Sequence, residues 1–185
     1  MAVVDQRDVQ RLGGRAALYP ASYIVVTLLE RRGLFNRVLD VTYGRGRFYA
    51  YRRPRFLVGA DPRVWEWIVA PDIFIPKPVW AVKSVLKHMN VRFDVVVCDP
   101  PFRQGTTYSD RDEYGYVLGT PRLIIEKTIE LARELGIGYM LLHYSELIDL
   151  PIVENIEFRY VSRYLNNPGL RTTTYFTLYR VGSRG

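Results

Sequence analysis

The chain has 185 residues, enough for one domain with a substantial core, and its 48% hydrophobic and 24% charged content is typical of a globular protein. No apolar run reaches the roughly 20 residues that span a bilayer, the N-terminus has no signal-peptide pattern, and a single cysteine excludes a disulfide framework or a cysteine-based zinc site, so we expect a cytoplasmic protein. The net charge is +7 and 22 of the 26 basic residues are arginine, which favours a nucleic-acid partner over a merely solvated surface, because guanidinium groups pair with phosphate and stack on bases.

The first predicted element is an N-terminal helical segment within residues 1–36. Residues 16–32 indicate a loop that leads into a helix, because Pro20 suits a first helical turn and Gly33 suits the position just past a helix end. A strand over 37–41 follows, with glycines at positions 44 and 46 directly after it. Glycines at this spacing let the backbone turn sharply and approach a ligand closely.

A second strand is predicted over residues 55–60, and it is followed by Asp61. This acid lies 21 residues after Asp40. In nucleotide-binding α/β folds, an acid about 20 residues beyond the first strand bonds ribose hydroxyls. The alternative for Asp61 is an N-cap of a short helix over 63–69, and the two roles are compatible.

Two connections depart from a regular alternation of strands and helices. Only residues 47–53 separate the glycines from Pro54, so the first crossover must be abbreviated. Residues 70–78 carry three prolines and cannot form a regular helix. We therefore expect an irregular loop there, followed by a third strand near 79–82.

The strand that organises the chain is the β-branched run Val95–Val97. It predicts a buried central strand that ends at Asp99, because Pro100 and Pro101 cannot continue a hydrogen-bonded ladder. In open α/β sheets, ligands bind at the carboxyl edge of the strands. The chain is thus expected to present a carboxylate at that edge, followed by a stiff turn and the ring of Phe102.

The C-terminal half predicts a loop, helices and three more strands. Residues 103–120 are polar and rich in turn formers, and a long loop directly after the Asp99 turn is a candidate substrate lid. The remaining predicted elements are a helix over 121–135, a strand over 137–143, a short helical piece near 145–149, and two strands over 156–164 and 171–181.

Three of these motifs follow the order found in class I S-adenosylmethionine (AdoMet)-dependent methyltransferases. The stretch 38–46 resembles the AdoMet-binding glycine loop, and Gly59-Ala60-Asp61 resembles the acidic second motif. Asp99-Pro100-Pro101-Phe102 resembles the catalytic motif of enzymes that methylate exocyclic amines of adenine, cytosine or guanine. The resemblance implies an α/β fold whose Rossmann-like, seven-stranded, mostly parallel sheet is flanked by helices and has an antiparallel C-terminal strand. It also implies a single methyltransferase domain over 1–185, with the cofactor and catalytic motifs in 37–102.

The resemblance further assigns roles to individual residues. The carboxylate of Asp99 and the carbonyl of Pro100 would accept the two N–H groups of the target amine, while Phe102 would stack on the base. The residues implied in catalysis are Asp99, Pro100, Pro101 and Phe102. Those implied in AdoMet binding are Tyr19, Pro20, Asp40, Thr42, Tyr43, Gly44, Gly46, Asp61 and Pro62. Those expected to bind substrate are Arg45, Arg47, Phe102, Arg103 and Tyr108.

Some positions depart from the family pattern or have plainer interpretations. The family often places an acid after the third strand to bond the adenine amine, but spacing puts Lys83 or Ser84 there, and Asp72 in the preceding loop is the alternative. Cys98 is interpreted as a small apolar residue of a buried strand. His143 is interpreted as a strand-end or core histidine, and two distant histidines give no metal site.

The predicted function is AdoMet-dependent methylation of an exocyclic base amine in nucleic acid. RNA is preferred over DNA, because no separate target-recognition domain is evident. Nine arginines in residues 31–63 would grip phosphate near the AdoMet edge, unless they form only a solvated rim. A partner subunit or homodimer fits this interpretation; a membrane partner does not. The alternatives are a protein lysine or amine methyltransferase, a non-catalytic nucleic-acid-binding module of the same fold and, less favoured, a nicotinamide dehydrogenase.

Overall fold

The computed structural model describes residues 2–3, 6–101, 120–146, 148, 153–167 and 170–182, and it places side chains for residues 8–101, 120–146, 148 and 174–182. The strands are β1 (Ala2–Val3), β2 (Arg37–Asp40), β3 (Phe56–Ala60), β4 (Ile73–Ile75), β5 (Val95–Cys98), β6 (Tyr139–Tyr144), β7 (Val153–Asn167) and β8 (Leu170–Val181). The helices are α1 (Gln6–Arg11), α2 (Gly14–Leu18), α3 (Pro20–Arg31), α4 (Val79–Leu86) and α6 (Pro121–Glu134), with a 3₁₀ turn η1 (Arg47–Tyr49).

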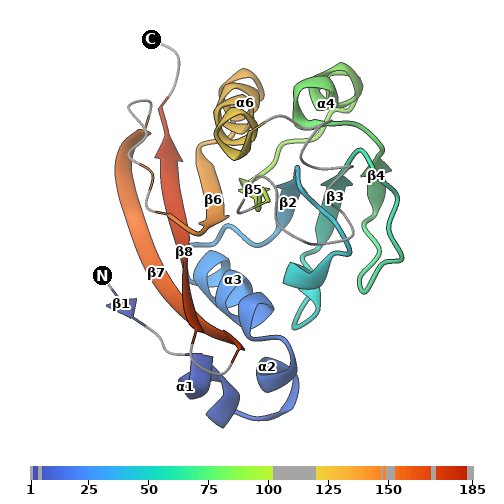
Figure 1. The fold of residues 1–185 in the computed structure, drawn as a ribbon. Helices are drawn as coiled ribbons and strands as arrows, with labels where there is room; N and C mark the ends of the chain where they lie inside the picture. The colour runs from blue at the N-terminus through green and yellow to red at the C-terminus, as the bar shows by residue number, and fades with distance from the viewer. Residues whose placement is uncertain are drawn as a thin grey trace.

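The strands form one sheet in the order β1-β7-β8-β6-β5-β2-β3-β4 (Figure 1). All neighbouring strands are parallel except β8, which runs antiparallel to both β6 and β7. The predicted α/β fold with a mostly parallel sheet and an antiparallel C-terminal strand is therefore confirmed. The sheet has eight strands rather than seven, and two-residue β1 pairs at its edge with β7.

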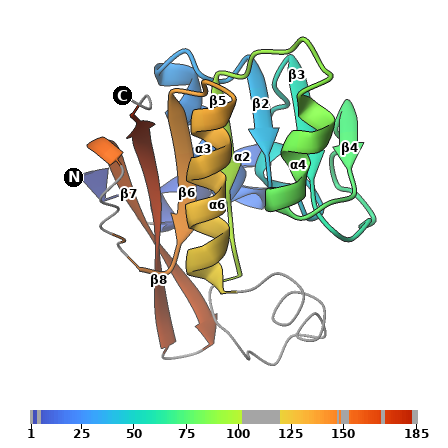
Figure 2. The same cartoon turned by 90° about the horizontal axis from the view of Figure 1, so that it is seen from above.

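Helices cover both faces of the sheet. Figures 1 and 2 together show α4 and α6 on one face and α3 on the other, with α2 beside α3. The central strand β5 is buried on both faces because its side chains alternate: Val96 and Cys98 pack in the cluster with α4 and α6, while Val95 and Val97 pack in the cluster with α3. Cys98 is fully buried in that core, as interpreted from the sequence.

Local signals fix the two longest helices. Pro20 is the first residue of α3, and Gly33, with φ of +67°, closes the chain after its end. Thr120 caps α6 by accepting a hydrogen bond from the Leu123 amide at 3.2 Å, and Pro121 begins the helix. None of the described helices is long and apolar enough to cross a bilayer.

The third strand and the helix after it differ from the prediction. The strand is β4, inside the proline-bearing stretch, and residues 79–82 belong to α4 instead. Prolines at 71 and 76 bracket the three residues of β4, and Pro78 precedes α4 at its N-cap, so here the prolines delimit elements rather than exclude them.

The remaining predictions concern short connecting segments. The abbreviated crossover after the glycines is confirmed, because residues 47–53 contain only the three-residue η1. Residues 63–69 do not form a helix; the amides of Ile68 and Val69 donate to the Arg45 carbonyl instead, at 2.8 and 3.4 Å. The helical piece predicted near 145–149 begins as a bend at Ser145 and Glu146, and most of its remainder lies outside the described residues. The candidate lid also lies outside them, except for Thr120.

Candidate active site

Three acids stand where neighbouring parallel strands end. Asp40 is the last residue of β2, Asp61 directly follows β3, and Asp99 directly follows β5. The strands adjoin in the order β5-β2-β3 and run in the same direction, so the three carboxylates meet at one edge of the sheet. This is the carboxyl edge, where open α/β sheets bind ligands.

The glycine turn after β2 is built around the ring of Tyr43. The Tyr43 amide donates to the Ala60 carbonyl at 3.1 Å, and its hydroxyl donates to the Val69 carbonyl at 2.6 Å. A side chain at Gly46 or Gly59 would collide with this ring. Tyr43 is only 3% exposed, so its ring supports the turn from beneath.

Gly44 leaves open space at the same turn. Its φ is +52°, a conformation that favours glycine, and an added Cβ would meet no heavy atom nearer than the Thr42 carbonyl oxygen at 4.0 Å. The backbone of the turn is thus unobstructed on this side by the described residues, which is what close approach by a ligand requires.

Asp40 is a buried acid that organises the turn. One carboxylate oxygen accepts from the Thr42 amide at 3.0 Å and from the Thr42 hydroxyl at 3.4 Å, and the other accepts from the Tyr49 hydroxyl at 2.8 Å. Burial raises the pKa of Asp40 to about 7; the hydrogen bonds from Thr42 and Tyr49 offset this only in part, and the charges of Asp99 and Asp61 add smaller upward contributions. Asp40 therefore changes protonation near neutral pH.

Asp61 ties the glycine turn to the chain that leaves β3. One of its carboxylate oxygens accepts from the Gly44 amide and the other from the Arg63 amide, both at 3.0 Å. The bond to Arg63 is the one expected of an N-cap, but no helix begins there. Asp61 is only 1% exposed, so the two hydrogen bonds hold a buried carboxylate in place.

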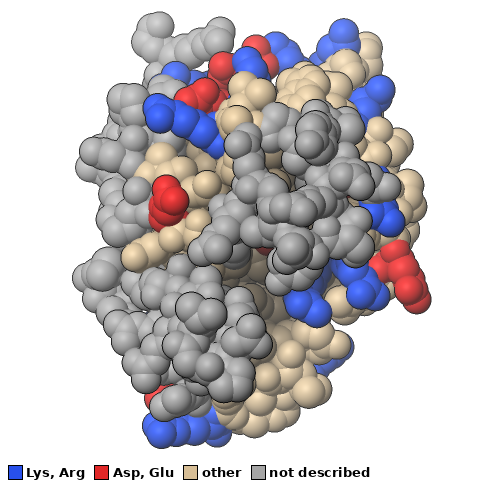
Figure 3. All heavy atoms as spheres, viewed as in Figure 1, with Lys and Arg blue, Asp and Glu red and all other residues tan. Residues whose placement is uncertain are grey.

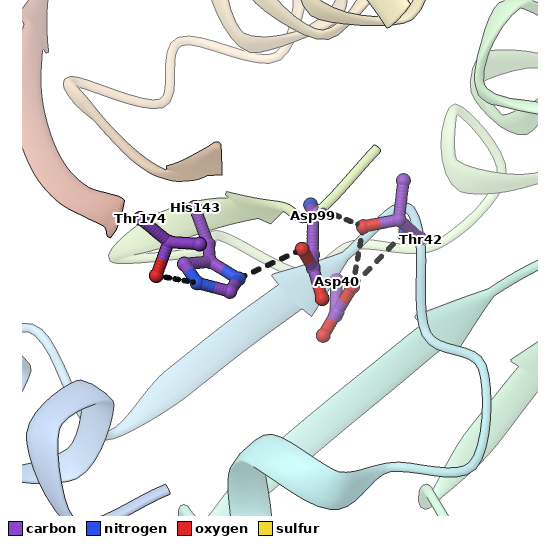
Figure 4. Close-up of polar contacts among 5 residues, drawn as sticks. All are labelled: Asp40, Thr42, Asp99, His143 and Thr174. Atoms are coloured by element: carbon purple, nitrogen blue, oxygen red, sulfur yellow. Dashed lines mark hydrogen bonds and ion pairs between the residues drawn. The ribbon is translucent and has the colours of Figure 1, made fainter. Parts of the chain in front are cut away.

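Asp99 lies between two polar contacts from neighbouring strands (Figure 4). Its backbone amide donates to the Thr42 hydroxyl at 2.6 Å, and its Oδ1 lies 2.9 Å from Nδ1 of His143. The other ring nitrogen of His143 lies 3.0 Å from the Thr174 hydroxyl. A continuous row of polar groups thus crosses β8, β6, β5 and β2, and the Asp99 side chain, about one third exposed, is its accessible member.

The row includes His143, to which the sequence analysis gave no functional role. His143 lies in β6, next to β5, and its side chain is 8% exposed. The signal for it in the sequence is its position: it is a polar residue near the end of the strand that follows the candidate catalytic motif, in a chain with only two histidines.

The remaining predicted site residues are placed as follows. Tyr19 joins α2 to α3 and Pro20 begins α3; both are half-buried. Helix α3 is joined to the segment after the glycine turn by Ser22. The Ser22 hydroxyl donates to the Phe48 carbonyl at 2.7 Å and accepts from the Tyr51 amide at 2.8 Å. Pro62 and Pro101 are half-buried and Pro100 is buried. Phe102, Arg103 and Tyr108 lie outside the described residues.

The nine arginines of residues 31–63 do not form one patch. Only Arg45, Arg47 and Arg63 follow the carboxyl ends of strands; the other six lie toward the opposite edge, at positions 31, 32, 37, 52, 53 and 55. Among those six, Arg52 pairs with Glu30 at 2.6 Å and Arg53 pairs with Asp72 at 2.7 Å. On the face shown in Figure 3, the Lys and Arg side chains of the described residues are likewise spread along the rim, with acidic side chains among them.

The structure does not bring Asp72, the alternative adenine-binding acid, to the carboxyl edge, and it places Lys83 and Ser84 in a helix rather than after the third strand. Asp72 lies at the amino end of β3, where its Oδ2 accepts from the Leu57 amide at 2.7 Å, so it faces away from the site. Lys83 and Ser84 belong to α4, where Lys83 pairs with Glu134 at 2.9 Å. Lys77 stands just beyond the end of β4 instead, and its amide donates to the Ile75 carbonyl at 2.8 Å.

The described residues contain no group of three or more His, Cys, Asp or Glu side chains that could hold a metal ion. No protein-family model matches the sequence. No curated protein sequence matches it either.

Solved structures do resemble the chain. A putative methyltransferase, yhhF, from Escherichia coli is 14% identical, with a TM-score of 0.53 over 88% of this chain and 84% of that one. The Thermoplasma acidophilum protein 1320 is 13% identical, with a TM-score of 0.55 over 97% of this chain and 96% of that one. Magnesium protoporphyrin IX methyltransferase from Synechocystis, solved with bound AdoMet, is 13% identical, with a TM-score of 0.49 over 95% of this chain and 83% of that one. At these identities the likeness shows the fold alone: yhhF and the Thermoplasma protein, the two with TM-scores above 0.5, share the Rossmann-like α/β fold of this chain.

Proposed function

We propose that the protein is an AdoMet-dependent N-methyltransferase that acts on an exocyclic amine of a nucleic-acid base, in RNA rather than DNA. The observation that carries this proposal is the bond from the Asp99 amide to the Thr42 hydroxyl, at 2.6 Å. It joins the candidate catalytic turn directly to the glycine turn, so a cofactor bound at one would stand beside the other.

The residues of the glycine turn fit AdoMet in kind. Asp61 offers carboxylate oxygens for ribose hydroxyls, and the open space at Gly44 would admit part of the nucleoside. Asp40, next in the row, would compensate the positive charge of the methionine ammonium. When bound, AdoMet supplies an electrophilic methyl group on a sulfonium.

Asp99 would prepare the amine for attack on that methyl group. An exocyclic base amine is a weak nucleophile because its lone pair is conjugated into the ring. Hydrogen bonds from its two N–H groups to the Asp99 carboxylate and the Pro100 carbonyl would favour tetrahedral geometry at nitrogen and direct the lone pair outward. The carboxylate would also stabilise the positive charge that develops on the nitrogen. The remaining requirement is in-line positioning of the two reactants.

The preference for RNA rests on charge and on size. The net charge of +7 suits a polyanion, and Arg45 and Arg47 are exposed beside the glycine turn. The described chain forms a single sheet with its covering helices, without a second unit to read duplex sequence. A protein amine is the second candidate, because a lysine amine could occupy the same place before Asp99.

The test uses tritiated AdoMet with purified protein and separate RNA, DNA and protein fractions. We expect label in RNA, and we expect Asp99→Ala to abolish it. Glu130→Gln, which removes an exposed acid on α6 paired with Lys127, is the matched control and should retain full transfer. Label in the protein fraction alone would favour the amine alternative. Full activity of Asp99→Ala would remove Asp99 from catalysis.

A further inference from the structure

His143 links two strands through both nitrogens of its ring. Nδ1 lies 2.9 Å from Oδ1 of Asp99, and Nε2 lies 3.0 Å from the hydroxyl of Thr174 on β8. His143 and Thr174 are buried, whereas about one third of the Asp99 side chain is exposed. The imidazole therefore connects the core to the carboxylate that faces the site.

These contacts select one tautomer of the neutral ring. An ionised carboxylate can only accept hydrogen bonds, so the proton must be on Nδ1, which donates to Asp99. Nε2 is then an acceptor, and the Thr174 hydroxyl, which can donate, completes the chain. The direction of both hydrogen bonds follows from the charge of Asp99.

Aromatic packing holds the imidazole in place. Phe176 stacks on it with ring centres 4.1 Å apart and planes 13° apart, and the Phe48 ring meets it edge-on at 5.5 Å. Phe48 is itself anchored, because the Ser22 hydroxyl donates to its carbonyl at 2.7 Å. With one face stacked on Phe176 and both nitrogens within hydrogen-bond distance of a partner, the ring has one orientation in which it can donate to Asp99.

We propose that His143 is a positioning residue for methyl transfer: by holding Oδ1 of Asp99, it fixes the carboxylate so that Oδ2 faces the target amine. The inference rests on the proposed function. The hydrogen bonds that Asp99 makes within the described residues use its amide and Oδ1, so Oδ2 is the oxygen available to a substrate. In the reaction the nitrogen lone pair forms the N–C bond, and the S–C bond breaks with its electron pair left on sulfur. The cationic nitrogen then gives one proton to Oδ2, from which water removes it.

The first test reads the tautomer without any substrate. Long-range ¹H–¹⁵N spectra resolve the ring nitrogens, and the chain has only two histidines, with exposed His88 as an internal reference. At a pH where the ring is neutral, we expect the proton of His143 on Nδ1. Asp99→Ala removes the acceptor, and the proton should move to Nε2 and donate to Thr174. A wild-type ring protonated on Nε2 alone would overturn the inference, whether or not the protein transfers methyl groups.

The second test separates positioning from packing. His143→Phe keeps an aromatic ring against Phe176 but cannot donate to Asp99, whereas His143→Asn places an amide N–H near the position of Nδ1. With RNA as methyl acceptor, we expect His143→Phe to lower kcat about 100-fold, the cost of a small misplacement of a catalytic group. His143→Asn should recover part of the loss, and AdoMet binding by calorimetry should change less than twofold in both variants.

The outcomes separate the inference from the proposed function. Wild-type protein that binds no AdoMet and labels no fraction contradicts the proposed function, while the tautomer result stands independently. If wild-type protein transfers methyl groups and His143→Phe does so at the same rate, the proposed function survives and the positioning role is wrong. Equal loss in His143→Phe and His143→Asn would also contradict it, since the donor would then be irrelevant.

Discussion

The backbone amide of Asp99 donates to the side-chain hydroxyl of Thr42 at 2.6 Å. The two residues are 57 positions apart in the chain, yet they follow the neighbouring strands β5 and β2. The same hydroxyl donates to Asp40 at 3.4 Å, so one side chain connects the turn after β5 to the buried acid of β2. The position of Asp99 therefore depends on the glycine turn.

Replacing Thr42 tests this dependence. Thr42→Val keeps the branched shape and removes the hydroxyl, which leaves the part-buried Asp99 amide without its acceptor; we expect a loss of about 1–3 kcal/mol in the free energy of unfolding. Thr42→Ser retains the hydroxyl and serves as the control. Urea unfolding of both variants measures the difference, and equal stability of the two would show that the hydrogen bond contributes nothing.

Gly59 is required by the ring beneath the glycine turn. A Cβ at this position in β3 would lie 2.5 Å from Cγ of Tyr43, so Gly59→Ala must displace the ring that supports the turn. We expect destabilisation of about 1–3 kcal/mol, as for an overpacked core, together with weaker AdoMet binding. Gly138→Ala is the matched control, because its Cβ would meet no atom within 4 Å, and it should be nearly neutral. Equal thermal unfolding of the two variants would contradict this account of Gly59.

The protonation of Asp40 should make stability depend on pH. Burial raises its pKa in the folded protein from 3.8 to about 7, so between these values the folded state holds a proton that the unfolded state has lost. The free energy of unfolding should therefore decrease as pH rises through this window, by at most about 4 kcal/mol, and level off above it. Asp40→Asn does not titrate, so its difference in stability from wild type should follow the same curve. A difference that is constant with pH would show that Asp40 stays ionised.

The sheet could be predicted largely because its strands are short, β-branched and bounded by turn residues. The run Val95–Val97 specifies a strand buried on both faces, since no polar residue interrupts it. The third strand is hard to locate from sequence because Ile73–Ile75 has only three residues, and so short a segment carries little periodicity. The apolar run from Val79 onward fits a buried strand or a helix equally well, and tertiary packing against α6 decides for the helix.

Part of the candidate site can likewise be located from the sequence and part cannot. Asp40, Asp61 and Asp99 can be placed at one edge of the sheet because each ends or follows a parallel strand, and the sequence pattern indicates those strands. The contact of His143 with Asp99 depends on the register of β6 against β5, in which Cys98 pairs with Leu142. Thr174 depends further on the antiparallel pairing of β8 with β6. Registers of distant strands cannot be read from local pattern, so these partners emerge only from the structure.

The position of Arg47 allows a test of whether RNA binds at the carboxyl edge of the sheet, as proposed. This exposed residue begins η1 directly after the glycine turn, while exposed Arg31 ends α3 near the opposite edge of the sheet. If RNA approaches the carboxyl edge, Arg47→Ala should lower the salt dependence of binding by about one phosphate contact, whereas Arg31→Ala should leave it unchanged. Titration of a fluorescent single-stranded RNA at several salt concentrations measures both slopes. A larger effect of Arg31→Ala on the slope would indicate that RNA binds at the amino edge of the sheet, away from Asp99. That result would contradict the proposal that RNA is the substrate.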